Sequence, residues 1–208
     1  MVGRRATVSG LTGYARASFP SMAVPDGEQA NWSMIHAITR QESQFDRQIV
    51  SRAGARGLMQ LMTPTAREVA GKMGLAFDQG ALFDPSYNVQ LGSSYFRQLL
   101  RYYGGSYPLA VAAYNGGMGN VNKWLKANGD PRMPGVDIIQ WIEDIPLFET
   151  RDYVQRVLEN AVADRIRERV RFYDWDRAAG EVRWMTAFDT TEADVDAFVD
   201  AITEELAR

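Results

Sequence analysis

Glu42 is the residue of this sequence with the clearest potential for chemistry. Residues 32–42 have helical spacing, and at about 100° per residue Ile35 and Ile38 lie on the same face as Glu42. A carboxyl group on an apolar stripe loses water, and a helix C-terminus is partly negative, so both effects raise its pKa. A carboxylic acid that keeps its proton near neutral pH can act as a general acid. The alternative is that Glu42 ends the helix and faces solvent.

The segment that follows is expected to fold back against this helix. Gly54 and Gly57 interrupt a short loop, and an apolar run over residues 58–62 contains one amide, Gln60. Thr63 followed by proline is typical of an N-cap and the first position of a new helix. A tight glycine turn would therefore place an apolar wall carrying an amide next to Glu42.

The remaining body of the chain, up to about residue 168, has helical patterns and no strand pattern. Asp84 followed by proline predicts a helix start, and the short apolar segment 107–114 predicts a helix buried on most sides. Helices are expected over residues 64–73, 85–103, 107–114, 120–126 and 148–170, and a short helix or a turn is expected over residues 137–145. The fold class predicted is mainly α.

The pattern changes after residue 170. Residues 171–208 carry 10 acidic and 4 basic side chains, whereas the preceding 170 residues carry 16 acidic and 19 basic ones. Segments 171–175 and 182–188 are rich in aromatic and β-branched residues, which favour strands, and a helix is expected to run to about Leu206. We therefore expect an irregular segment over 1–21, a catalytic body over 22–170 and a β-β-α tail over 171–208 without activity of its own.

Composition excludes several classes of function. The sequence has no cysteine, which rules out disulfides, thiol nucleophiles and zinc–thiolate sites, and its single histidine, His36, makes a histidine metal site or a serine protease triad unexpected. We interpret His36 as a partly buried helix residue. No apolar run reaches the roughly 20 residues of a membrane span, and residues 1–10 have no apolar signal-peptide region. We expect a monomer that does not bind nucleic acid, because the body is only mildly basic.

Four ordered motifs carry a resemblance to a known family. They are Glu42-Ser43, Gly57 to Met62, Ala113-Tyr114-Asn115-Gly116-Gly117 and Glu149 to Val154. Together, over about residues 14–168, they resemble the soluble lytic transglycosylases of bacterial cell-wall turnover. The family usually has alanine where Gly116 stands and proline where Met118 stands, and neither difference removes a reactive group.

The resemblance implies a fold, a reaction and a location. The fold is a lysozyme-like helical domain with a substrate cleft, and the substrate is a peptidoglycan glycan strand. The bond between N-acetylmuramic acid and N-acetylglucosamine is cleaved, and the sugar's own 6-hydroxyl replaces water, which gives 1,6-anhydromuramic acid. No metal or cofactor is implied, and the location is the periplasm or cell envelope. A single acid agrees with substrate-assisted glycosidases, which need no second carboxylate.

The resemblance also implies roles for individual residues. Glu42 is the catalytic acid, and Ser51 matches a serine hydrogen-bonded to it, although a loop cap explains this serine equally well. The other positions implied to line the cleft or hold substrate are Gln60, Met62, Tyr114, Asn115 and Glu149. Arg151 and Tyr153 are expected to be structural.

Two alternatives to this function remain open, and the tail has a resemblance of its own. A hydrolytic muramidase of the goose-lysozyme kind shares the fold and the glutamate but generally adds an acid that activates water. A non-catalytic glycan-binding module is the other alternative, although binding alone does not need a buried acid. Residues 171–208 resemble the C-terminal end of pyridoxal-phosphate threonine aldolases, whose Schiff-base lysine lies upstream; no lysine follows Lys126 here.

Overall fold

The computed structural model describes residues 22–27, 29–169, 173–176, 181–183 and 191–206. The predicted irregular segment 1–21 lies outside the described residues. The chain divides into two compact units, of which one is Met22–Glu159 and the other includes Asn160–Arg208. This division falls within one helix, and the boundary near residue 170 stays a prediction.

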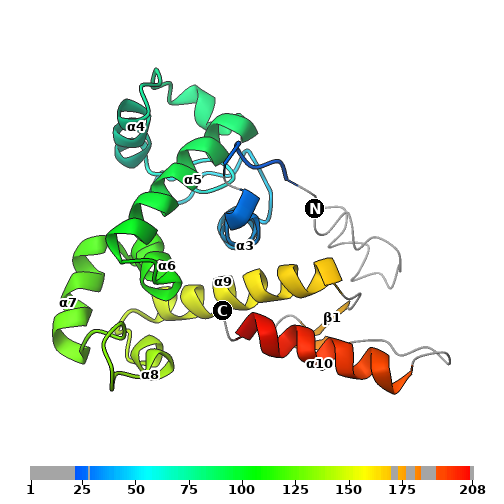
Figure 1. The fold of residues 1–208 in the computed structure, drawn as a ribbon. Coiled ribbons are helices and arrows are strands. Elements are labelled where there is room, and N and C mark those ends of the chain that lie inside the picture. Colours follow the sequence, from blue (N-terminus) through cyan, green and yellow to red (C-terminus); the bar gives the residue numbers. More distant parts are fainter. Residues whose placement is uncertain (1–21, 28, 170–172, 177–180, 184–190, 207–208) are drawn as a thin grey trace. The chain divides into compact units, whose positions relative to one another are not determined.

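The unit Met22–Glu159 is built from helices (Figure 1). In chain order these are η1 (Gln29–Asn31), α3 (Trp32–Ser43), α4 (Thr63–Lys72), η2 (Gly80–Phe83), α5 (Pro85–Tyr102), α6 (Tyr107–Gly116), α7 (Met118–Asn128), α8 (Ile138–Glu143) and the first part of α9 (Phe148–Arg169). Helix α5 contacts α4, η2 and α6, and α6 contacts α7. Among the described residues before α9, the β pairing consists of isolated bridges that join Arg56 to Val50 and Leu61. The mainly α prediction is confirmed.

Helix α3 is held by the stripe that the sequence predicts. Ile35 and Ile38 are fully buried, because their spacing keeps both on the face turned to the core. His36 is also buried, and its ring stacks on Trp32 at 4.7 Å and packs on Phe45 at 4.8 Å between centroids. His36 therefore lies on a helix as expected, but it is fully buried where the sequence predicted partial burial.

Several helix boundaries differ from the predicted ones by one or two residues. Asp84 caps α5 as expected, since its carboxylate accepts a hydrogen bond from the Tyr87 amide at 2.9 Å. Helix α4 begins at Thr63 instead of after it, because the last extended residue is Met62. Helix α7 begins at Met118, directly after Gly117 with its φ of 82°. The prediction that Thr63 is an N-cap is therefore wrong, although the helix follows where expected.

The other unit contains short strands and a helix. Strand β1 (Tyr173–Asp176) pairs antiparallel with β2 (Glu181–Arg183), and α10 (Glu192–Leu206) follows. The predicted strands extend into residues 171–172 and 184–188, which lie outside the described part of the chain.

No helix among the described residues is long and apolar enough to cross a membrane.

Candidate active site

Glu42 lies in the last turn of α3 and is bound by a tyrosine from α9. The Tyr153 hydroxyl donates a hydrogen bond to Glu42 Oε1 at 2.7 Å, and Tyr153 itself is buried. The Glu42 side chain keeps partial access to solvent, while protein groups replace most of the water around its carboxyl. This arrangement joins residues that are 111 positions apart in the sequence.

The environment raises the pKa of Glu42 from 4.5 to about 7. Burial is the main cause, because it penalises the charged form. The hydrogen bond from Tyr153 acts in the opposite direction, since it stabilises the carboxylate, and the negative charge of Glu149 raises the pKa further. Near neutral pH a large fraction of the molecules therefore holds a proton on Glu42, which is the state a general acid needs.

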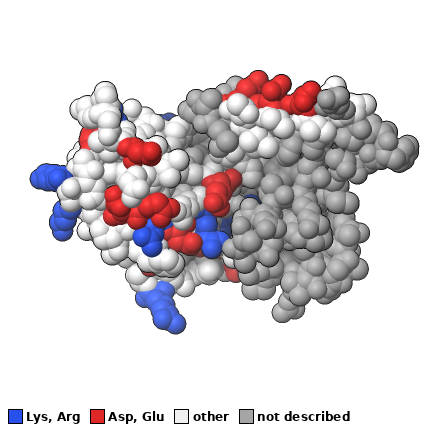
Figure 2. All heavy atoms as spheres, turned by 90° about the horizontal axis from the view of Figure 1, so that it is seen from below, with Lys and Arg blue, Asp and Glu red and all other residues white. Residues whose placement is uncertain are grey.

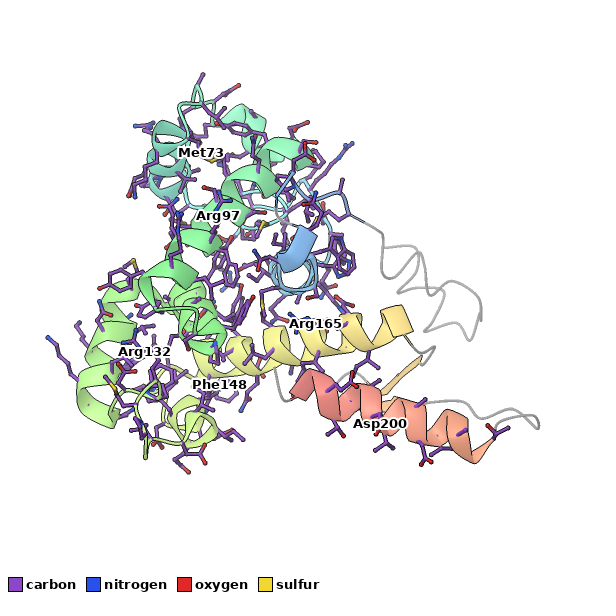
Figure 3. All side chains as sticks on the ribbon, viewed as in Figure 1. Met73, Arg97, Arg132, Phe148, Arg165 and Asp200 are labelled. Carbon is purple, nitrogen blue, oxygen red and sulfur yellow. The ribbon has the colours of Figure 1, made fainter. Side chains whose placement is uncertain are left out.

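Two further predicted residues lie close enough to Glu42 to interact with it electrostatically. Burial raises the pKa of Tyr114 well above its usual value, and the charge of Glu42 adds to this effect. Glu149 lies in the first turn of α9, directly after Phe148, whose position at the start of that helix Figure 3 marks. The Glu149 side chain is exposed, so α9 presents a solvated carboxylate near the buried one.

The loop after α3 forms a wall that is fixed at Met59. The Met59 amide donates to the Asn88 side-chain oxygen at 2.8 Å, and the Tyr114 hydroxyl donates to the Met59 carbonyl oxygen at 2.8 Å. The Met59 side chain is buried and fills the space over Gly92, where a Cβ atom would overlap the Met59 sulfur. Tyr114 is thus oriented by the loop that the sequence predicts to fold back.

Asn115 is bound to a second residue of α9. The Thr150 hydroxyl donates to Asn115 Oδ1 at 2.7 Å, and Thr150 is 2% exposed. Thr150 follows Glu149 in sequence, so the first two turns of α9 supply an acidic side chain, a contact to Asn115 and the tyrosine that binds Glu42.

Two predicted site residues, Ser51 and Gln60, form hydrogen bonds within the loop. The Ser51 hydroxyl accepts a hydrogen bond from the Ala55 amide at 3.0 Å. Within the described part of the chain, the side-chain hydrogen bond to Glu42 comes from Tyr153 and none comes from Ser51. The Gln60 amide donates to the Gly57 carbonyl at 2.8 Å and to the Ile49 carbonyl at 3.2 Å. Ser51 therefore caps its own turn as an acceptor, while the hydroxyl keeps its proton for a second partner, and the hydrogen bond expected between Ser51 and the acid stays a prediction.

Met62 differs from those two residues because its side chain faces solvent. It is 40% exposed although it follows a buried run. Burying such a side chain against a ligand is favourable, and methionine adapts readily to irregular shapes. Its exposure agrees with a place on a binding surface.

Sequence reasoning missed three residues that position the site. It assigned Tyr153 a structural role, whereas its hydroxyl contacts Glu42 directly. Asn88 is fully buried on α5 and binds both the loop and η2, because its amide donates to the carbonyls of Arg56 and Leu82. A polar residue on the buried face of a predicted helix was the available signal for Asn88, and hydroxyls in the fourth motif were the signal for Thr150 and Tyr153.

The acidic side chains of the described residues form no metal site. No group of three or more histidine, cysteine, aspartate or glutamate residues there could hold a metal ion. Figure 2 shows acidic side chains gathered with lysine and arginine among them on the face seen from below. The two signs of charge are mixed on this face, and the expectation that the protein does not bind nucleic acid stays a prediction.

Comparisons with known proteins agree with this arrangement. The family described as "Transglycosylase SLT domain" matches residues 23–133. The soluble lytic murein transglycosylase of Escherichia coli is 37% identical over 134 residues, which are 64% of this chain and 20% of that protein. A putative soluble lytic murein transglycosylase of Haemophilus influenzae is 39% identical over 124 residues, 59% of this chain and 20% of that protein.

Solved structures of similar proteins have the same fold. An inactive glutamate-to-glutamine mutant of the lytic transglycosylase Slt from Pseudomonas aeruginosa is 37% identical with a TM-score of 0.62, covering 77% of this chain and 26% of that one. The 70 kDa soluble lytic transglycosylase from Escherichia coli is 31% identical with a TM-score of 0.62, covering 77% and 27%.

The chain spans about a fifth of the length of the curated relatives it matches, so the likeness concerns one domain of each. The family match ends at residue 133, and the resemblance of the tail to aldolases stays a prediction. The family match covers more than half of the sequence, the predicted motifs from Glu42 to Gly117 fall inside it, and the helical fold is that of lysozyme-like lytic transglycosylases. The chain therefore belongs to the transglycosylase SLT domain family.

Proposed function

We propose that this protein is a lytic transglycosylase that cleaves the β-1,4 bond between N-acetylmuramic acid and N-acetylglucosamine in peptidoglycan. The observation that carries the proposal is the partly buried carboxyl of Glu42, which has a pKa of about 7 and accepts a hydrogen bond from Tyr153. The names of the relatives and the inactive glutamate-to-glutamine mutant of one of them support it. Murein belongs to the cell envelope, so we place the protein there, in the periplasm; the monomeric state stays a prediction.

In the proposed reaction Glu42 acts twice. Its proton passes to the glycosidic oxygen as the bond from that oxygen to C1 breaks. The 2-acetamido group of the sugar stabilises the positive charge that develops at C1. The Glu42 carboxylate then removes the proton from the 6-hydroxyl, whose oxygen forms the new bond to C1. The cycle returns Glu42 to its protonated form without a water molecule.

The remaining predicted residues are proposed to hold the glycan. Tyr114 and Asn115 face the reacting sugar, Met62 offers exposed apolar surface, and Ser51 and Gln60 contribute from the loop. Glu149 is proposed to hold substrate hydroxyl groups with its exposed carboxylate. Support comes from the electrostatic contact of Glu42 with Tyr114 and Glu149.

Glu149 also favours a second candidate function, a hydrolytic muramidase. An inverting glycosidase needs a carboxylate that activates water on the far side of the sugar. Glu149 is exposed, and its charge acts on Glu42, so it is the residue that such a reaction would use.

The products distinguish the two reactions. We expect a digest of purified peptidoglycan to release muropeptides that are lighter by one water molecule than those from a hydrolytic muramidase run in parallel. Mass spectrometry of both digests makes the comparison. A digest that contains only reducing-end muramic acid would assign the chain to the hydrolases.

The pH dependence of activity should report the pKa of Glu42. Because the acid must be protonated, kcat/KM is expected to fall as the pH rises above about 7. Tyr153→Phe removes the hydrogen bond that lowers the pKa, so the fall should move to higher pH. Glu149→Gln removes the charge that raises the pKa, so the fall should move to lower pH. Rate profiles of wall digestion test both shifts, and shifts of the same sign would contradict this electrostatic assignment.

A further inference from the structure

The amide of Asn115 has its orientation set by Thr150. The Thr150 hydroxyl donates to Asn115 Oδ1 at 2.7 Å, which leaves the two N–H groups of the amide as its remaining hydrogen-bonding groups. Asn115 is partly exposed, whereas Thr150 is 2% exposed, so Asn115 has surface that a ligand can reach while its oxygen is bound to a buried hydroxyl.

Gly116 packs closely against Thr150. A Cβ atom at Gly116 would lie 3.1 Å from both Thr150 Oγ1 and Thr150 Cγ2, and 3.1 Å from a ring carbon of Trp124. These distances are tighter than ordinary contacts, so a Cβ atom there would require Thr150 or Trp124 to move by a few tenths of an ångström. The Gly116 carbonyl is also fixed, since it accepts a hydrogen bond from the Asn120 side-chain amide at 2.9 Å.

We propose that Thr150 is a positioning residue that holds Asn115 with its amide N–H groups toward the glycan, so that Asn115 binds an acceptor oxygen of the sugar. This inference rests on the proposed function, because it assigns Asn115 to the substrate site. A hydroxyl or acetamido carbonyl oxygen is the chemical group that such a donor recognises. Without Thr150, Asn115 can rotate and present its own oxygen, which cannot donate that hydrogen bond.

The test compares two changes at Thr150 with a matched control. Thr150→Val keeps the shape and removes the hydroxyl, whereas Thr150→Ser keeps the hydroxyl. Thr39→Val is the control, because Thr39 is also buried but donates to the Ile35 carbonyl within its own helix at 2.8 Å. We expect Thr150→Val to reduce kcat/KM on isolated glycan strands about 3- to 15-fold, the size typical of one hydrogen bond. Thr150→Ser should restore most of this loss, and Thr39→Val should leave kcat/KM near the wild-type value.

A double-mutant cycle with Asn115→Ala separates positioning from a purely structural role. If Thr150 acts through Asn115, Thr150→Val has no further effect in the Asn115→Ala background. An equal loss in both backgrounds, or no rescue by serine, would overturn the proposal.

A second measurement keeps the proposal independent of turnover. In the same double-mutant cycle, the affinity for N-acetylglucosamine oligomers is measured in place of kcat/KM. The NMR signals of the Asn115 side-chain amide are recorded as well. Thr150→Val should weaken binding and shift these signals, and Thr150→Ser should return both. A wild-type chain that binds the oligomers but cleaves no glycan would contradict the proposed reaction while this cycle still decides the role of Thr150. Unchanged binding and unchanged amide signals in Thr150→Val would overturn the positioning role.

Discussion

Glu42→Gln should abolish wall digestion while leaving the protein folded. Positioned general acid–base catalysis typically contributes about 10²–10⁴-fold, and here one carboxyl performs both the protonation and the proton removal. Glutamine has the same size and can still accept the hydrogen bond from Tyr153, but it cannot transfer a proton. Turnover of purified peptidoglycan by the purified variant is the measurement. Activity near the wild-type level would remove Glu42 from the chemistry.

The stability of Glu42→Gln, compared with the wild type at two pH values, tests the raised pKa of Glu42. Because the pKa of Glu42 is raised from 4.5 to about 7, folding favours the protonated form. The contribution of Glu42 to the free energy of unfolding is therefore fully present below about pH 4.5 and is lost as the pH rises through about 7. Glu42→Gln should be about as stable as the wild type in acid and more stable at pH 8, by up to roughly 3 kcal/mol. Urea unfolding at the two pH values measures the difference.

Gly57→Ala should destabilise the protein severely, whereas Gly54→Ala should not. Both glycines lie in the loop after α3 with positive φ, 75° and 89°, so alanine is strained at either position. Nothing lies within 4 Å of a Cβ atom at Gly54, but a Cβ atom at Gly57 would overlap the Leu82 carbonyl oxygen and the Asn88 amide. We expect a cost of about 1–2 kcal/mol for Gly54→Ala and at least about 3–5 kcal/mol for Gly57→Ala.

The comparison of the two glycines also tests how the site is assembled. Displacing Asn88 would release the Met59 amide, and with it the carbonyl that orients Tyr114. Wall digestion should therefore fall more in Gly57→Ala than in Gly54→Ala, even at a temperature where both variants are folded. Equal stability of the two variants by thermal unfolding would show that the close contact at Gly57 is relieved elsewhere.

The sequence predicted the parts of this structure that depend on local patterns. The apolar spacing around Ile35 and Ile38, the cap at Asp84 and the glycine turn at Gly57 each follow from short-range rules. The same spacing placed Glu42 on a partly buried face, which is why its raised pKa was predictable in direction.

Contacts between distant segments were not predictable in the same way. Tyr153 reaches Glu42 across 111 positions, and Asn88 reaches Met59 across 29, so no local pattern records either hydrogen bond. Ser51 illustrates a local contact, because its hydroxyl accepts a hydrogen bond from the Ala55 amide within the same turn. Such a short-range hydrogen bond is favoured because closing a turn of four residues costs little entropy.

Titration of the Glu42 carboxyl by carbon NMR tests the central claim most directly. In a protein labelled at its glutamate side chains, the signal absent from Glu42→Gln identifies this residue. We predict that this signal titrates with a pKa of about 7, well above the ordinary value of 4.5. A Glu42 signal that titrates near 4.5 would contradict a protonated acid near neutral pH, and with it the proposed mechanism.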